Sequence, residues 1–256
     1  YHTAWGDAPA QAKAAWDKQV DAFYTLEEKG GLPQTRALGE INAFMQPGDI
    51  AVGSAGSLPG DMQRLWRTRQ RDAYHMEYGF SNMGYEINGA VGVKLACPEQ
   101  EVYAFFGDGT YLMAHSEMVT AVQENLRVHF CLFDNAGWGC IESLQNSQGN
   151  DTYGTVFRKR NAETGLLDGD PLPIDYAANA AAYGLTAYTV RTVQELREAL
   201  EKGRSANGPV LYDIKVLPGT MTPGFDSWWR VGVAEVSTQP EVQAAYAAMQ
   251  EQIKHT

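Results

Sequence analysis

A carboxylate and a carboxamide follow two apolar runs of the chain that have the length of buried strands. Asp108 comes two residues after the run Val102 to Phe106, and Asn135 comes two residues after the run Val128 to Phe133. Parallel strands joined by one crossover helix end at the same edge of a sheet, so these two side chains should lie close together. Two hard oxygen ligands, completed by waters and a phosphate, suit Mg²⁺. The spacing therefore predicts a metal-bridged diphosphate site.

Glycines flank the acidic residue. Gly107 and Gly109 would let the backbone approach a phosphate closely, and Gly109-Thr110 leads toward a helix whose N-terminus favours anions. A lone Gly-Asp-Gly more often marks only the turn after a strand. Here a helical pattern separates the two strands, and an asparagine and a glycine stand where the second strand ends, so we favour the functional interpretation.

The segment Gly107-Asp108-Gly109, followed by 25 residues and then Asn135, resembles the signature of enzymes that use thiamine diphosphate (ThDP, also called thiamine pyrophosphate). The resemblance implies that Asp108, the Asn135 side chain and the backbone carbonyl of Gly137 hold Mg²⁺. It also implies that Gly107, Gly109 and Thr110 contact the diphosphate. The family usually has two asparagines here, and this chain has Asp134 in place of the first. Because the second asparagine is the ligand, the site is retained.

Short apolar strands alternate with helical stretches along the rest of the chain. This alternation predicts an α/β fold with a doubly wound, mostly parallel sheet and helices on both faces, which is also the ThDP-binding fold. We expect a helical N-terminal extension over residues 1–48 and the diphosphate-binding domain over 49–220. An irregular segment and a closing helix should follow over 221–256. The Gly-, Asn- and Asp-rich stretch 136–172 is typical of a long functional loop.

Two further segments are expected to border the cofactor. Asp49 to Val52 is predicted to be a strand that leads into the small-residue turn Gly53 to Ser57, the usual place for a ligand-binding loop. We therefore expect Gly56 and Ser57 to contact the cofactor, although an ordinary flexible loop would have the same composition. Met83 begins a predicted helix, and the resemblance implies that it supports the two cofactor rings in their bent arrangement. Methionine at this spacing also suits a plain core position.

Three titratable side chains are candidates for moving protons. His75, Glu77 and His115 lie before or after the predicted site segments, and histidine titrates near neutral pH. Hydrogen-bonded structural roles are at least as common for such residues. We favour His75 as the catalytic candidate. The pair Trp228-Trp229 could line a substrate pocket, but aromatic pairs more often close a core or an interface.

Charge and cysteine content narrow the class of protein. A net charge of −11 argues against nucleic acid or an anionic membrane as the main partner. The three cysteines, Cys97, Cys131 and Cys140, form no CxxC pair and are expected to be buried small residues rather than metal ligands. The sequence shows neither an 18-residue apolar run nor a signal-peptide pattern. We therefore expect a cytoplasmic protein.

The length fits only part of a ThDP enzyme. In the resembled enzymes the active site is shared with a pyrimidine-binding domain, which carries the activating glutamate. We find no match to that domain, or to a middle domain, in the 256 residues, and the chain starts at Tyr1 rather than Met. We expect the pyrimidine domain to be supplied in the same polypeptide or by a separate chain, and the assembly to be a homo-oligomer. Trimming of a complete domain is the simpler alternative.

Several runs across the chain indicate a narrower family. They are Leu58-Pro59-Gly60-Asp61, Tyr74 to Gly79, Phe133-Asp134-Asn135, Pro173 to Tyr176 and Ser227 to Val233. These runs resemble the ThDP-dependent trihydroxycyclohexane-1,2-dione hydrolases of inositol catabolism, which implies hydrolytic opening of a polyol-derived cyclic diketone to 5-deoxy-glucuronate. Asn82 and Trp138 stand where that family has other residues.

Two alternatives remain open on the sequence alone. The chain could be the diphosphate-binding subunit of a split ThDP-dependent decarboxylase, which would need a partner chain for its glutamate. It could also be a non-catalytic Mg²⁺- or nucleotide-binding module, because an open parallel sheet hosts many functions. The first alternative predicts co-purification with a second polypeptide, and the second predicts a preference for a nucleotide over ThDP.

Overall fold

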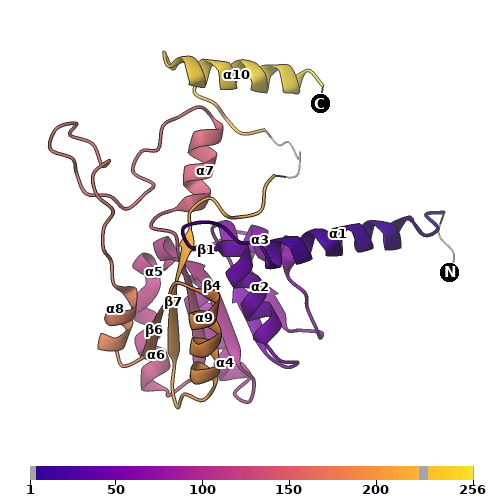
Figure 1. Cartoon of the computed structure of the whole chain (residues 1–256), viewed down its shortest axis with the longest axis vertical. Coiled ribbons are helices and arrows are strands. Elements are labelled where there is room, and N and C mark those ends of the chain that lie inside the picture. Colours follow the sequence, from indigo (N-terminus) through magenta and orange to yellow (C-terminus); the bar gives the residue numbers. More distant parts are fainter. Residues whose placement is uncertain (1–3, 225–229, 256) are drawn as a thin grey trace.

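The computed structural model describes residues 4–224 and 230–255. Its centre is a seven-stranded sheet in the order β1-β7-β5-β4-β2-β3, with β6 also paired to β7 (Figure 1). Every strand pair is parallel. The strands are β1 (Leu32–Pro33), β2 (Ile50–Gly53), β3 (Tyr74–Met76), β4 (Val102–Gly107), β5 (Val128–Asp134), β6 (Thr186–Val190) and β7 (Val210–Leu217). The predicted α/β class and parallel sheet are confirmed.

Helices cover both faces of this sheet. α1, α2, α3 and α9 pack on one face, and α4, α5, α6 and α8 pack on the other. The helices are α1 (Ala8–Tyr24), α2 (Gln34–Phe44), α3 (Ser57–Leu65), α4 (Tyr85–Ala96), α5 (Asp108–Ala114), α6 (Met118–Gln123), α7 (Gly139–Ser147), α8 (Tyr176–Ala182), α9 (Val193–Arg204) and α10 (Pro240–Ile253).

Alternating side chains of the central strands supply two separate cores. In β4, Tyr103 and Phe105 belong to the core under α2 and α9, whereas Ala104 and Phe106 belong to the core under α4 and α8. This alternation is what a strand covered by helices on both faces requires. Cys131 is fully buried in β5, while Cys97 and Cys140 are only partly buried; all three are free thiols.

Two predicted segments differ from the structure. The stretch 136–172, expected to be a long loop, contains helix α7. α7 is short and buries none of its residues, and the Gly-, Asn- and Asp-rich composition around it favoured a loop. Residues 1–48 are not only helical, because Leu32 and Pro33 pair with Val216 and Leu217 and so add β1 to the sheet. A two-residue strand is too short to show a period of two.

A buried histidine lies near the amino ends of the central strands. His129 is fully buried and stacks on Tyr103 with ring centroids 4.3 Å apart. Its Nε2 lies 2.9 Å from Glu101 Oε2 and its Nδ1 lies 2.9 Å from the Tyr212 hydroxyl. A carboxylate can only accept, so Nε2–H donates to Glu101 and Nδ1 accepts from Tyr212. This pattern fits a neutral ring, and burial lowers the pKa of His129 despite Glu101.

The buried histidine predicts a loss of stability in mild acid. Because its pKa is lower in the folded state, His129 contributes stability that is lost as pH falls below about 6.5, its unfolded value. The slope that one such group can add is at most about 1.4 kcal/mol per pH unit. Burial raises the pKa of Glu101, but bonds from His129 and Arg127 outweigh burial and hold it at about 2, so its contribution is lost only below pH 4.5.

Urea unfolding at several pH values measures this slope. His129→Gln should flatten the slope between pH 6.5 and 5 whatever its effect at pH 7. An unchanged slope in this variant would assign the acid sensitivity to other groups.

Candidate functional site

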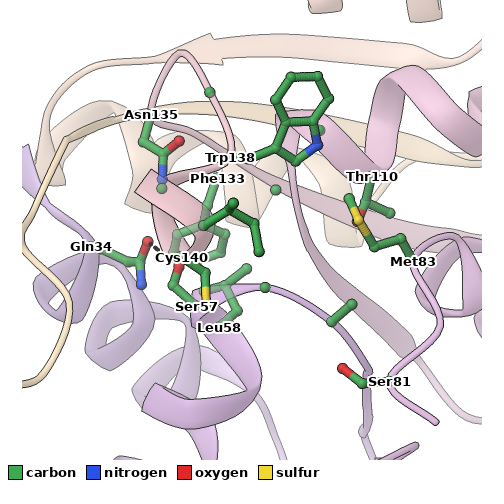
Figure 2. Close-up of a pocket in the computed structure, with 17 residues that line it drawn as sticks. Gln34, Ser57, Leu58, Ser81, Met83, Thr110, Phe133, Asn135, Trp138 and Cys140 are labelled. Carbon is green, nitrogen blue, oxygen red and sulfur yellow. Dashed lines mark hydrogen bonds between the residues drawn. The ribbon is translucent and has the colours of Figure 1, made fainter. Parts of the chain in front are cut away.

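A cavity of about 270 Å³ opens at the carboxyl edge of the sheet, beyond the ends of β2, β4 and β5 (Figure 2). This is the edge at which parallel α/β sheets bind ligands. The residues that line it are Gln34, Ala55, Gly56, Ser57, Leu58, Ser81, Met83, Gly107, Gly109, Thr110, Phe133, Asn135, Gly137, Trp138, Gly139, Cys140 and Ile141. All seven residues predicted to contact the cofactor are among them, so the structure brings together segments that are far apart in the sequence.

Asp108 lies directly behind this cavity. Its side chain is fully buried, with Oδ1 accepting from Gly109 N at 3.0 Å and Oδ2 accepting from Gly137 N at 2.9 Å. Burial raises the pKa of Asp108 and the neighbouring Asp134 carboxylate raises it further. A bound cation would lower the pKa of Asp108. The buried carboxylate is therefore placed where a positive charge would stabilise its ionised form.

Asn135 presents an oxygen without a partner. Its Oδ1 atom is buried and accepts no hydrogen bond from any residue that the structure describes. A buried amide oxygen of this kind is costly unless a ligand satisfies it. Across residues 4–224 and 230–255, no three His, Cys, Asp or Glu side chains converge to hold a metal. The oxygen set of one carboxylate, one amide and nearby backbone carbonyls fits Mg²⁺ and would not suit a softer metal.

Two glycines of the site, Gly109 and Gly137, have no room for a side chain. A Cβ on Gly109 would lie 2.2 Å from Trp138 Nε1, and a Cβ on Gly137 would lie 2.4 Å from the carbonyl oxygen of Thr155. Gly137 sits opposite Val156 in an isolated antiparallel bridge, whose hydrogen bonds are made by the residues on either side. Its own backbone groups therefore face away from that segment, and its N–H donates to Asp108.

Lys215 explains how the chain accommodates Asp134. The Lys215 ammonium forms ion pairs with Asp134 and, at 2.9 Å, with Asp213 Oδ2. Asp134 Oδ1 also accepts from the backbone N–H of Ala136 at 2.9 Å. Burial alone would lower the pKa of Lys215, but the two carboxylates outweigh burial and raise it. The extra acidic residue beside the site is thus paired with a cation that it shares with Asp213. The sequence analysis did not identify Lys215, which is 80 residues away from Asn135.

Gln34 is a second residue that the sequence analysis missed. It begins α2, is 3% exposed and reaches the cavity wall, where Ser57 Oγ donates to its Oε1 at 3.2 Å (Figure 2). Its Nε2 donates to Asp61 Oδ2 at 2.7 Å, and Asp61 accepts two further bonds from Thr222. The segment before residue 49 therefore contributes to the site. An isolated glutamine before an apolar helix gave no signal of this role.

The candidate proton shuttles lie outside the cavity lining. His75 is exposed and its Nε2 bonds to the Tyr85 hydroxyl. Glu77 accepts from the backbone N–H groups of Phe80 and Asn82. His115 Nδ1–H donates to the Tyr111 carbonyl at 2.9 Å. The catalytic role of His75 stays a prediction. Trp228 and Trp229 lie outside the described residues.

Curated relatives match nearly the whole chain but are much longer. The chain is 48% identical to a protein of Geobacillus thermodenitrificans named 3D-(3,5/4)-trihydroxycyclohexane-1,2-dione hydrolase, over 99% of this chain and 43% of the relative. It is 54% identical to a Bacillus cereus protein named 3D-(3,5/4)-trihydroxycyclohexane-1,2-dione hydrolase 2, over 90% of this chain and 35% of the relative. The chain thus spans less than half the length of these relatives.

A solved structure shares the fold. The ThDP-dependent 4-hydroxybenzoylformate decarboxylase of Rhodococcus jostii RHA1 superposes with a TM-score of 0.64 over 75% of this chain and 34% of the decarboxylase. Sequence identity is 19%, so the likeness supports the fold alone.

A sequence family covers the segment that builds the cavity. The family described as thiamine pyrophosphate enzyme, C-terminal TPP binding domain, matches residues 54–214. That range includes Asp108, Asn135 and the loops that carry Ser57 and Met83. The chain therefore belongs to the thiamine pyrophosphate enzymes, and this segment is their C-terminal TPP-binding domain.

Proposed function

We propose that this chain is the diphosphate-binding part of a ThDP- and Mg²⁺-dependent hydrolase that cleaves a carbon–carbon bond. The reaction would open trihydroxycyclohexane-1,2-dione to 5-deoxy-glucuronate in inositol catabolism, in the cytoplasm. The observation that carries the proposal is that a buried Asp108 and an unpartnered Asn135 oxygen lie at the same edge of the sheet, beside a cavity of the TPP-binding domain. The printed names of the relatives support the choice of substrate.

Each residue of the cavity has a separate task in this proposal. Asp108, Asn135 Oδ1 and the Gly137 carbonyl would hold Mg²⁺. Gly107, Gly109 and Thr110 would receive the diphosphate, and Gly56 and Ser57 would contact the cofactor from the loop after β2. Met83 would support the rings. When bound, ThDP supplies an electron sink for the carbanion that carbon–carbon cleavage leaves, which no side chain can do.

The rest of the lining would limit access of water. Leu58, Phe133 and Ile141 give the cavity apolar walls. In such surroundings the attraction between a cation, Asp108 and a diphosphate is stronger than in water. An unpaired charge costs more free energy in such a low dielectric than in water. The ion pair between Asp134 and Lys215 lowers this cost beside the cavity.

Apolar side chains near the cavity indicate where a further domain would dock. Ile141 lines the cavity yet is 52% exposed, and Met113 on α5 is 62% exposed. Large exposed apolar groups around a site are typical of a surface that another domain or subunit covers. We infer that a pyrimidine-binding domain, which would carry the activating glutamate, covers this surface within a homo-oligomer. None of the helices in the part of the chain that the structure describes is long and apolar enough to cross a membrane.

Titration calorimetry distinguishes this proposal from a nucleotide-binding module. We expect the chain to bind ThDP in the presence of Mg²⁺ at least tenfold more tightly than ATP, a difference of about 1.4 kcal/mol. Removing Mg²⁺ with a chelator should weaken ThDP binding, because the diphosphate would then face Asp108 without a cation between them. Thiamine without phosphates serves as the control and should bind much more weakly. A clear preference for ATP would contradict the ThDP assignment.

A further inference from the structure

One buried carboxylate joins two walls of the cavity without lining it. Glu86 lies in the first turn of α4 and is fully buried. Its Oε1 accepts from the backbone N–H of Ala55 at 2.8 Å, and its Oε2 accepts from the backbone N–H of Gly84 at 3.0 Å. Ala55 lines the cavity in the same loop as Ser57, and Gly84 follows Met83, which lines the cavity from a second loop.

The chemistry of these two bonds requires a carboxylate. Both partners are N–H donors, and only an ionised carboxylate offers an accepting oxygen to each. A glutamine at this position would turn its NH₂ group toward one of the two N–H groups and lose that bond. The N-terminal turn of α4 also favours a negative charge. Burial raises the pKa of Glu86, and the donated backbone bonds act in the opposite direction.

Serine side chains tie the same two loops together. Ser54 Oγ donates to the Asn82 carbonyl at 3.0 Å, and Ser81 Oγ donates to the Ser54 carbonyl at 3.4 Å. Gly84 has a φ of +99° and a Cβ there would lie 3.0 Å from the Ala114 Cβ, so a larger residue does not fit at this turn. The spacing between the Ala55 wall and Met83 is therefore fixed mainly by Glu86 and Ser54.

We infer that Glu86 is a positioning residue that sets the width of the cavity beside Met83 and so controls recognition of the ligand's rings. This inference rests on the proposed ThDP function. Figure 2 shows Ser81 and Met83 on one side of the cavity and Asn135 on the other. Glu86 therefore acts on the side of the cavity away from Asn135, and a change there should affect binding of the rings of ThDP more than binding of its diphosphate.

Two ligands separate these two sides in the assembled protein, with the pyrimidine domain present. The affinity for ThDP with Mg²⁺ depends on both the Met83 side and the metal side of the cavity. The affinity for inorganic diphosphate with Mg²⁺ depends mainly on the metal side. In Glu86→Gln we expect the Kd for ThDP to rise at least tenfold and the Kd for inorganic diphosphate to change less than twofold. Ser54→Ala removes the second tie and should raise the Kd for ThDP a few fold in the same selective way.

Leu200→Ala provides the matched control. It removes a buried side chain of α9 that packs on the opposite face of the sheet from α4, so it lowers stability without touching the cavity. Its affinities for both ligands should stay within twofold of wild type. This control separates a positioning role from a general loss of stability.

The possible outcomes are distinct. Either of two results would overturn the positioning role and leave the proposed function intact. One is an equal loss of affinity for both ligands in Glu86→Gln. The other is an unchanged preference for ThDP in both Glu86→Gln and Ser54→Ala. If Glu86→Gln fails to fold, the selective loss in Ser54→Ala decides the question. A wild-type protein that binds inorganic diphosphate as tightly as ThDP would overturn both the inference and the proposed function.

Discussion

Replacing either Asp108 or Asn135 with alanine is expected to abolish Mg²⁺-dependent binding of ThDP. Each change removes one of only two side-chain ligands, and the diphosphate would then meet an acidic chain of net charge −11 without sufficient compensation. We expect a loss of at least 100-fold in affinity, or about 2.7 kcal/mol, for each variant. Titration calorimetry at fixed Mg²⁺ measures the loss directly.

The fold should survive both substitutions. Asp108 and Asn135 lie beyond the ends of β4 and β5, so the paired strands beneath them keep their register. Circular dichroism should therefore be unchanged. Glu117→Ala, which removes an exposed carboxylate shortly after α5, is the control and should bind ThDP normally. Retained Mg²⁺-dependent affinity in either site variant would place the metal elsewhere.

The residues of this site that could be predicted are those marked by local pattern. β4 and β5 are continuous apolar runs, and each is followed directly by a polar side chain. The parallel register of Gly107 with Phe133 then brings Asp108 and Asn135 to the same edge, as the topology required. The predicted alternation of strands and helices is also clear after residue 174, where β6, α9 and β7 follow one another and Thr192 forms a capping box at the start of α9.

The residues that could not be predicted make their contacts with residues that are distant in the sequence. Gln34 meets Ser57, and Lys215 meets Asp134, only after the sheet has formed. In the sequence, Glu86 cannot be distinguished from an ordinary exposed charged residue of a helix. It is buried because the loop that carries Ala55 packs against it. α7 is a short helix with no buried residue, inside a stretch whose composition is typical of a loop. Local periodicity therefore identified the strands and their ends, whereas the network that supports the site required the three-dimensional arrangement.

The residues of the cavity account for binding of the cofactor but not for its activation. The cavity gathers residues suited to a cation, a diphosphate and an apolar ring, yet His75, Glu77 and His115 do not line it. Among the cavity residues, Cys140 is the only one with an ionisable side chain, and burial raises the pKa of its thiol. A thiol held in its neutral form is a poor general base. The group that activates the cofactor is therefore expected on a different domain, as the resembled enzymes imply.

The 256-residue chain by itself is accordingly expected to bind Mg²⁺ and ThDP weakly and to release no acid from the cyclic dione. It spans 43% of one relative and 35% of another, so cofactor contacts from the remaining domains would be missing. Its exposed apolar groups near the cavity, such as Ile141 and Met113, should also cause self-association. Turnover should appear when the pyrimidine and middle domains are supplied in the same polypeptide or as a second chain. Carboxylic acid release from trihydroxycyclohexane-1,2-dione, followed with and without those domains, measures the effect.

Two controls make this result specific. The reconstituted protein with Asp108→Ala should stay inactive, which shows that turnover passes through the cavity described above. A reconstituted protein in which the exposed Glu117 is replaced by alanine should be fully active. Robust turnover by the isolated chain would mean that the activating base lies within its 256 residues, and the proposed division of labour between domains would be wrong. In that case His75, Glu77 and His115 would be the first residues to substitute, because each would have to reach the cavity in a conformation that differs from the one observed.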